Sequence, residues 1–239
     1  MQALILAGGR GTRLHPYTLV YPKPLLPVGG RPIIHTIVDQ LSFFGYTDIV
    51  ISLGYLGNYI RMYFSEEKNV PPGTAIRYID ERDPLGTAGP VAMVSDLQEN
   101  FLVINGDILT TIDFGALMQF HLDQGAQLSI VVGVKEVKLA LGIVTLDDQR
   151  RITSFEEKPT RTFMDNMGIY VYRKSVAKGI TPGVRLDVNQ LVTGMIGRGE
   201  KVCGFVSSEP YYWIDIGQHG DYERANEVFA GKRDQFLRS

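Results

Sequence analysis

Residues 1–14 read MQALILAGGRGTRL, a short apolar run that leads into three glycines and two arginines. The run from Ala3 to Leu6 is typical of a strand buried on both faces, as in a parallel sheet. Because glycine has no Cβ, the backbone N–H groups after this strand can approach an anion closely. The guanidinium groups of Arg10 and Arg13 suit phosphate oxygens. The stretch therefore predicts a strand followed by a phosphate-binding loop.

Outward from this loop, short apolar runs alternate with helical patterns through the first half of the chain. We expect strands at 3–6, 49–53, 75–79, 101–104 and 128–132, and helices at 32–44, 56–64, 90–97 and 114–124. This alternation favours an α/β fold with a doubly wound sheet and right-handed crossovers.

The pattern changes after Val134. Further strands are expected at 142–146, 151–155, 167–172 and 202–206, and further helices at 186–196 and 219–229. This half is predicted to be a mixed or antiparallel extension that covers one end of the sheet. Since no linker composition occurs, we expect one domain over 1–239, with halves of about 1–134 and 135–239.

Composition narrows the class of protein. The chain has 239 residues, 44% hydrophobic and 21% charged, and its formal net charge is -2. No overall positive field is available for nucleic acid. A single cysteine, Cys203, forms no internal disulfide, which fits a reducing compartment. The apolar start lacks a basic segment and is too short for a signal or a membrane span. We expect a cytoplasmic protein without membrane or nucleic-acid partners.

Two known glycine-rich motifs do not match the loop. A P-loop requires Lys-Ser or Lys-Thr after its last glycine. The dinucleotide fingerprint requires a third glycine where Leu14 stands, which disfavours an NAD enzyme. Further on, Pro22 and Pro24 restrict the backbone on both sides of Lys23. This lysine either meets a phosphate or is a solvated side chain in a rigid loop.

The motifs, taken in order, resemble the nucleotide-sugar pyrophosphorylases, or sugar-1-phosphate nucleotidyltransferases. The resemblance runs through Gly8-Gly9-x-Gly11-Thr12-Arg13-Leu14-x-Pro16-x-Thr18, Pro22-Lys23-Pro24, Leu85-Gly86-Thr87-Ala88-Gly89, Asn105-Gly106-Asp107, Phe155-Glu156-Glu157-Lys158-Pro159, Asn166-Met167-Gly168 and Trp213-Ile214-Asp215-Ile216-Gly217. It implies a Rossmann-like, GT-A-like mixed sheet with an inserted sugar-binding half. It also implies Mg²⁺-dependent transfer of a nucleoside monophosphate from an NTP to a sugar 1-phosphate.

The resemblance also implies residue roles. The catalytic residues would be Arg13, Lys23 and Asp107; Arg13 and Lys23 would bind the triphosphate, and Asp107 and Asp215 would bind Mg²⁺. The nucleotide-binding set would be Leu6, Ala7, Gly8, Gly9, Gly11, Thr12, Arg13, Lys23, Glu81, Gly86, Thr87, Ala88 and Gly89. The sugar phosphate would be bound by Gly142, Glu157, Lys158 and Asn166. Family members often have an aromatic residue where this chain has Leu141, so sugar packing is expected to differ.

The chemistry can be checked against these residues. A sugar phosphate is largely a dianion at neutral pH, so no general base is required. Accordingly, we expect the four histidines to be noncatalytic. The obstacle is repulsion between anions, which fixed cations and Mg²⁺ on oxygen ligands would overcome. Asp107 follows an apolar strand, and ligands bind at the carboxyl ends of strands in open α/β sheets.

Substrate identity and rival functions stay open on the sequence. The Leu85–Pro90 string is closest to the mannose-1-phosphate guanylyltransferases, so the leading expectation is GTP with mannose 1-phosphate or a related heptose or aldose phosphate. The alternatives are uridylyl or thymidylyl transfer to glucose-type phosphates, and a noncatalytic subunit that binds nucleotide sugars. A GT-A glycosyltransferase would normally have Asp-x-Asp, but the chain has Asp107-Ile108-Leu109. A homo-oligomer is possible, as in relatives.

Overall fold

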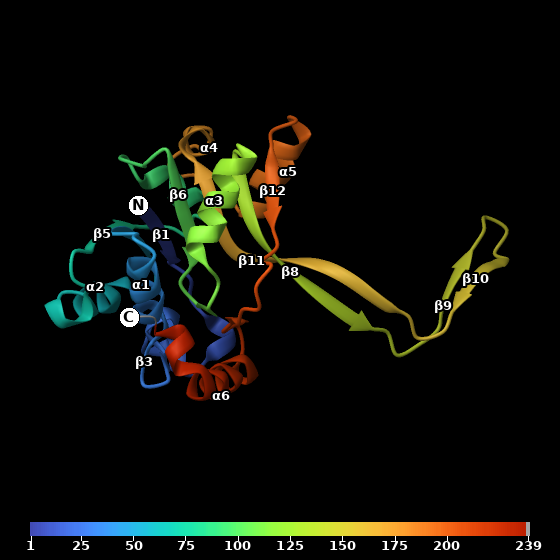
Figure 1. Ribbon diagram of the computed structural model, residues 1–239, viewed down its shortest axis with the longest axis horizontal. Coiled ribbons are helices and arrows are strands. Elements are labelled where there is room, and N and C mark those ends of the chain that lie inside the picture. Colours follow the sequence, from blue (N-terminus) through green and yellow to red (C-terminus); the bar gives the residue numbers. More distant parts are fainter. Residues whose placement is uncertain (238–239) are drawn as a thin grey trace.

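The computed structural model describes residues 1–237, and its centre is one seven-stranded sheet (Figure 1). The strand order is β12-β8-β11-β6-β1-β4-β5. The strands are β1 (Gln2–Ala7), β4 (Asp48–Leu53), β5 (Ala75–Asp80), β6 (Asn100–Asn105), β8 (Leu128–Lys138), β11 (Thr160–Arg173) and β12 (Val202–Phe205). Strands β6, β1, β4 and β5 are parallel neighbours, whereas β11 is antiparallel to both β6 and β8. The predicted mixed α/β sheet is confirmed.

Helices cover both faces of the sheet, so each face has its own core (Figure 1). Along β1, Ala3 and Ile5 belong to one core, and Leu4 belongs to the other. The helices are α1 (Ile33–Phe43), α2 (Gly57–Tyr63), α3 (Phe114–Gln124), α4 (Lys174–Lys178), α5 (Val188–Gly197) and α6 (His219–Phe236). Burial on both faces explains why the parallel strands are continuous apolar runs.

Local signals account for the helix boundaries. At the start of α3, the carboxylate of Asp113 accepts a hydrogen bond from the backbone N–H of Ala116, and the helix ends at Gly125 in the left-handed region.

Among the described residues, no helix is sufficiently long and apolar to cross a membrane.

Short elements complete the fold. The 3₁₀ helices are η1 (Thr12–Leu14), η2 (Tyr17–Leu19), η3 (Lys23–Leu25), η4 (Glu67–Asn69) and η5 (Gly89–Met93). Three small antiparallel pairs join β2 (Pro27–Val28) to β3 (Arg31–Pro32), β7 (Ile108–Thr110) to β13 (Trp213–Asp215), and β9 (Ile143–Leu146) to β10 (Ile152–Glu156).

The α-helix predicted at 90–97 is wrong, because only η5 forms there. The backbone N–H of Gly89 donates to the carbonyl of Leu186 in a distant loop. Ser95 and Asp96 favour turns, and Asp96 accepts a hydrogen bond from Arg77. Tertiary contacts at both ends therefore override the apolar spacing.

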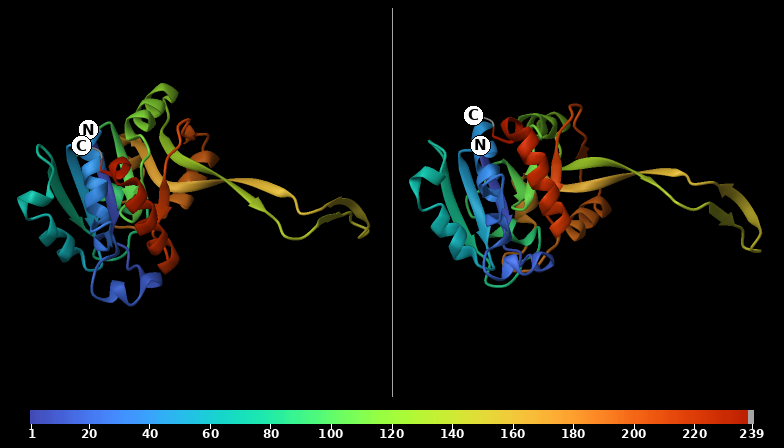
Figure 2. Two further views of the ribbon diagram at one scale, coloured as in Figure 1. Left: turned by 60° about the horizontal axis from the view of Figure 1, so that its bottom comes forward. Right: turned by 90° about the horizontal axis from the view of Figure 1, so that it is seen from below.

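In the half predicted to extend over one end of the sheet, residues 134–166 instead project away from it (Figures 1 and 2), while the end of β11 and all of β12 join the central sheet. Strands β8 and β11 continue as a pair beyond the other strands, and the β9–β10 hairpin lies at their far end. The β8–β11 register shifts between Asn166 and Tyr170, where the pair leaves the sheet. Such bulges increase local twist and bend a strand.

Candidate active site

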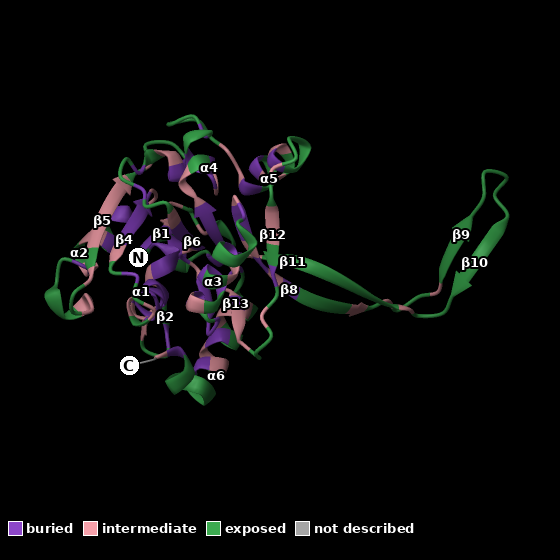
Figure 3. Ribbon diagram, turned by 45° about the horizontal axis from the view of Figure 1, so that its top comes forward, coloured by how far each residue is buried: buried purple, intermediate pink, exposed green. Residues whose placement is uncertain are grey.

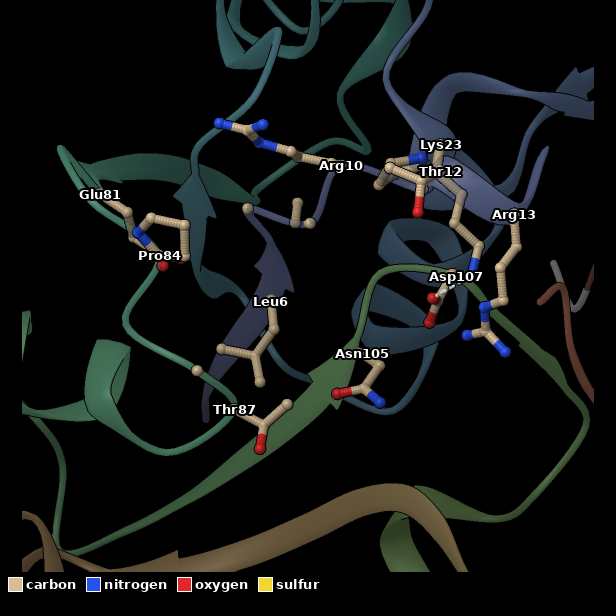
Figure 4. Close-up of a pocket in the computed structure, with 16 residues that line it drawn as sticks. Leu6, Arg10, Thr12, Arg13, Lys23, Glu81, Pro84, Thr87, Asn105 and Asp107 are labelled. Atoms are coloured by element: carbon tan, nitrogen blue, oxygen red, sulfur yellow. Dashed lines mark hydrogen bonds and ion pairs between the residues drawn. The ribbon is translucent and has the colours of Figure 1, made fainter. Parts of the chain in front are cut away.

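A cavity of about 390 Å³ opens at the carboxyl ends of β1 and β6 (Figure 4). Eleven of the predicted nucleotide-binding residues line it, namely Leu6, Ala7, Gly8, Gly9, Gly11, Thr12, Arg13, Lys23, Glu81, Gly86 and Thr87. The other lining residues are Arg10, Pro24, Pro84, Asn105 and Asp107. The first half of the chain thus builds one cationic cavity at the predicted edge of the sheet.

Close contacts account for Gly8 in the loop after β1 and for Gly54 beside it, whereas a Cβ on Gly9 would meet nothing within 4 Å. A Cβ on Gly8 would lie 2.5 Å from Oε1 of Glu81, and a Cβ on Gly54 would lie 2.5 Å from the carbonyl oxygen of Gly8. Gly11 has a φ of +61°, and its carbonyl accepts a hydrogen bond from Thr18. The loop is therefore held in one conformation.

Lys23 is a buried lysine, 8% exposed, so it is not the solvated side chain that the sequence left open. Pro22 and Pro24 flank it at the start of η3. Its ammonium forms an ion pair with Asp107 and lies 3.6 Å from Oδ1 of Asp215. The stiff backbone thus aims Lys23 at the two carboxylates predicted to bind metal.

Asp107 and Asp215 converge because β7 and β13 pair beside the sheet. Asp215 lies opposite Ile108, and the backbone N–H of Ile216 donates to the carbonyl of Asp107. One buried oxygen of each carboxylate, Oδ1 of Asp107 and Oδ1 of Asp215, has no hydrogen-bond partner. Burial, and then the charge of Asp107, raise the pKa of Asp215, while Lys23 and Arg13 act in the opposite direction.

This donor set fits Mg²⁺. Two carboxylate oxygens without a hydrogen-bond partner offer the hard ligands that this ion prefers. In residues 1–237, no group of three or more His, Cys, Asp or Glu residues forms a closed metal site. Mg²⁺ is usually held by one or two carboxylates with substrate phosphates and water. Two carboxylates beside an anion cavity match that arrangement.

Glu81 and the 85–89 loop form the opposite wall of the cavity. Glu81 accepts a hydrogen bond from the hydroxyl of Ser52 at 2.6 Å and another from the backbone N–H of Leu85 at 3.0 Å. Ala88 and Gly89 are buried behind the wall and do not line the cavity. Their backbone N–H groups donate to the carbonyl of Leu186, which holds the loop in place.

The predicted sugar-phosphate residues are divided between two places. Asn166 lines a smaller cavity of about 140 Å³ together with Asn105 and Asp215. Gly142, Glu157 and Lys158 lie on the projecting pair, outside both cavities.

These three residues lie near one another. A Cβ on Gly142 would lie 3.2 Å from Oε2 of Glu157, and the Lys158 ammonium is 3.7 Å from Oε1 of Glu157. Lys158 has a φ of +45°, an uncommon value for a side chain with a Cβ.

Asn105 is a lining residue to which the sequence assigned no role. It contributes to both cavities, and its buried Oδ1 has no hydrogen-bond partner. The Asn105-Gly106-Asp107 motif could have identified Asn105 as a site residue, but we assigned a function only to its aspartate. Arg10 also lines the larger cavity, as its place in the glycine loop indicated.

Comparisons with known proteins agree on one family. A family model described as nucleotidyl transferase matches residues 2–231. A probable mannose-1-phosphate guanylyltransferase 1 of Oryza sativa subsp. japonica is 34% identical, over 93% of this chain and 63% of that protein. The chain spans 62–64% of the length of the curated relatives it matches.

Two solved structures share the fold. HddC from Yersinia pseudotuberculosis is 28% identical, with coverage of 95% of this chain and 99% of the other. Its TM-score is 0.72, or 0.69 for the form complexed with GMP-PN. A putative glucose-1-phosphate thymidylyltransferase from Bacillus anthracis, in complex with a sucrose, is 27% identical, with a TM-score of 0.73 and coverage of 99% and 98%.

Proposed function

We propose that this chain, which belongs to the nucleotidyl transferase family, transfers a nucleoside monophosphate from an NTP to a sugar 1-phosphate and releases pyrophosphate. The observation that carries the proposal is the convergence of Asp107 and Asp215 beside Lys23 and the glycine loop, each carboxylate with one buried oxygen that has no hydrogen-bond partner. This arrangement suits a reaction between two phosphate anions around a divalent ion.

The triphosphate would lie along the glycine loop. Backbone N–H groups of Gly8 to Gly11 and the guanidinium groups of Arg10 and Arg13 are the donors on this side of the cavity. Asp107 and Asp215 would hold Mg²⁺, which supplies charge neutralisation at the phosphates when it is bound. Lys23 would then pair with a phosphate oxygen instead of the carboxylates.

The attacking phosphate oxygen does not need a general base to remove its proton. A sugar phosphate has a second pKa of about 6, so its attacking oxygen is already ionised at neutral pH. No histidine lines the cavity. The chain's contribution would be to hold the α-phosphate and the attacking oxygen in line, which replaces a bimolecular encounter by a positioned one.

The sugar side would be bound by Asn166 and by the Glu157–Lys158 pair. Lys158 carries the charge suited to the incoming phosphate, and the Glu157 carboxylate accepts hydrogen bonds from hydroxyl groups. Asn166 already donates to the hydroxyl of Tyr170 at 2.9 Å, and its Oδ1 accepts from the backbone N–H of Gly168. It is therefore fixed at the edge of the smaller cavity.

For the nucleobase and sugar, the leading candidates are GTP and mannose 1-phosphate or a related aldose or heptose phosphate. This choice is supported by the names of the curated relatives and by the HddC complex with GMP-PN. Thymidylyl transfer is the second candidate, because the Bacillus anthracis structure has a comparable TM-score.

A pyrophosphate-release assay tests the proposal. Purified chain with Mg²⁺ is crossed with GTP, ATP, UTP and dTTP against mannose 1-phosphate, glucose 1-phosphate and a heptose 1-phosphate. We expect release only when an NTP and a sugar phosphate are both present, with GTP the preferred nucleotide. Asp107→Asn is the control that should abolish it. Absence of release in every pair would refute the function and favour a noncatalytic binding role.

A further inference from the structure

Residues 134–166, here called the arm, form a two-stranded ribbon that stands clear of the rest of the molecule (Figure 2). None of these residues is buried, and almost the whole arm is exposed in Figure 3. An isolated two-stranded ribbon is marginally stable at best in water. The extended arm therefore requires contacts that its own chain does not supply.

One face of the β9–β10 hairpin at the end of the arm is apolar. Phe155 pairs with Val144, and Ile152 pairs with Leu146. Opposite residues in an antiparallel pair share a face, and Val144 and Leu146 are two residues apart, so all four side chains lie on one side. Phe155 is 63% exposed and the nearby Leu141 is 76% exposed. Contiguous exposed apolar side chains mark an interaction site.

The charge of the arm argues for a protein partner. Six basic and six acidic side chains lie between residues 134 and 166, so the arm carries no net charge. Binding to a nucleic acid or to an anionic membrane would require an excess of basic side chains.

A second set of exposed apolar side chains lies on η2, on the loop after it and on α2, outside the cavity lining. This set, here called the rim, comprises Tyr17, Leu19, Val20, Tyr21, Tyr59 and Met62, all exposed. It is joined to the phosphate loop, because Thr18 within it donates to the carbonyl of Gly11 at 2.8 Å. The rim and the hairpin face belong to the same chain, so two copies could cover both surfaces twice in a closed, twofold arrangement.

The arm also carries residues that the cavity lacks. Lys158 is eight residues along β11 from Asn166, roughly 25 Å at the rise of an extended strand. Within one chain, Lys158 therefore lies far from the cavity, and the predicted sugar-phosphate residues of that cavity are incomplete.

Building on the proposed function, we infer that a second copy of the chain receives the arm on its rim, and that Lys158 and Glu157 bind the sugar phosphate in that second copy's cavity. Each composite site then contains the nucleotide residues of one copy and the arm of the other.

The first test uses mass and crosslinking, which do not depend on activity. The unmodified chain should have twice the 26.6 kDa chain mass by light scattering. The double variant Ile152→Asp/Phe155→Asp should be monomeric with an unchanged circular dichroism spectrum, because neither residue belongs to a core. A monomeric mass for the unmodified chain, or a dimer unaffected by the double variant, overturns the inference.

A crosslink distinguishes an arm that lies on the rim of a second copy from an arm that folds back onto the rim of its own chain. In a Cys203→Ser background, Glu157→Cys and Tyr21→Cys are combined in one chain and treated with a short bismaleimide. Covalent dimers are expected, whereas an internal crosslink at monomer mass shows the arm on its own rim and overturns the inference. Each single variant, and Glu157→Cys combined with Arg198→Cys at the C-terminal end of α5, should give no product.

The second test uses turnover. Lys23→Ala chains and Lys158→Ala chains are co-expressed and assayed at a sugar-phosphate concentration well below the KM of the Lys158→Ala variant, where each variant alone has little turnover. About a quarter of the unmodified turnover should return, because half of the randomly assembled dimers hold one intact composite site. No recovery overturns the exchange of residues. If the unmodified chain shows no turnover with any substrate, the proposed function fails, and mass and crosslinking still decide the inference.

Discussion

The ammonium of Lys23 lies 3.6 Å from Oδ1 of Asp215, while the same ammonium forms an ion pair with Asp107. The lysine thus sits between the two carboxylates assigned to Mg²⁺. Lys23 and Mg²⁺ would neutralise the same two carboxylates. Removal of Lys23 should therefore make the stability of the protein depend on Mg²⁺.

Lys23→Met should therefore make stability sensitive to magnesium. Without the ammonium, Arg13 alone opposes the repulsion between two partly buried carboxylates, and the free energy of unfolding should fall by about 1–3 kcal/mol in EDTA. Urea titrations with and without MgCl₂ measure the effect, and Mg²⁺ should restore more stability to the variant than to the unmodified chain. Lys138→Met, on the exposed arm, is the control. Equal Mg²⁺ responses in all three proteins would contradict this account.

Gly86→Ala should lower stability and NTP affinity by more than the positive φ of residue 86 alone would cause. Gly86 and Gly73 both have a φ of +76°, but a Cβ on Gly86 would lie 2.6 Å from the carbonyl oxygen of Leu186, whereas a Cβ on Gly73 meets nothing within 4 Å. Gly73→Ala should cost about 1–2 kcal/mol for the left-handed conformation alone. Gly86→Ala should cost more and weaken NTP binding, as measured by calorimetry. Similar results for the two variants would exclude the steric role of Leu186.

Lys158→Ala should affect the sugar phosphate and spare the nucleotide. Loss of a charge-assisted hydrogen bond to phosphate should raise the KM for the sugar phosphate roughly 10- to 100-fold. The NTP dissociation constant should stay within about twofold, because Lys158 does not line the nucleotide cavity. Lys138→Ala on the same arm is the matched control. Equal losses for both substrates would show that Lys158 acts on the whole site.

His121 should make the protein acid-sensitive between pH 6.5 and 4. Burial, and then the charge of Arg173, lower the pKa of His121 from 6.5 to about 4. The ring is fully buried; Nε2 donates to Asn100, and Nδ1 accepts from the hydroxyl of Ser129. The unfolded chain binds the proton more readily, so stability is complete above pH 6.5 and is lost as the pH falls, by about 3 kcal/mol in total.

Melting temperatures from pH 7 to pH 4 measure this loss. His121→Gln, which cannot take up the proton, should flatten the dependence over that window. An equally steep curve for the variant would assign the acid sensitivity to other groups.

The sequence predicted much of the cavity because its residues follow the ends of neighbouring strands. Gly8 and Asp107 come within three residues of apolar runs, Arg13 lies in the loop that follows the first run, and parallel strands place their carboxyl ends at one edge. Sequence motifs could not separate lining residues from supporting ones. Ala88 and Gly89 belong to the same motif as Gly86, yet they face Leu186, whose position depends on the folded chain.

The sequence also did not predict the direction in which the arm leaves the sheet. Residues 142–146 and 151–155 have the composition of strands, but alternation alone does not say which surface covers a hairpin. An apolar face packed on its own sheet and one packed on another molecule give the same pattern of side chains. The register shift between Asn166 and Tyr170 accompanies the departure from the sheet, and Gly168 within it has a φ of +70°. A glycine inside a strand marks a bulge but does not give the direction in which the strand then runs.

Phosphorus-31 NMR of a reaction containing the chain, Mg²⁺, GTP and mannose 1-phosphate tests the central claim most directly. The account predicts loss of both substrate signals and the appearance of two coupled diphosphate resonances of a nucleotide sugar together with an equal amount of pyrophosphate. The spectrum should stay unchanged with Asp107→Asn. Orthophosphate as the sole product, or an unchanged spectrum with the unmodified chain and every NTP and sugar 1-phosphate pair, would contradict it.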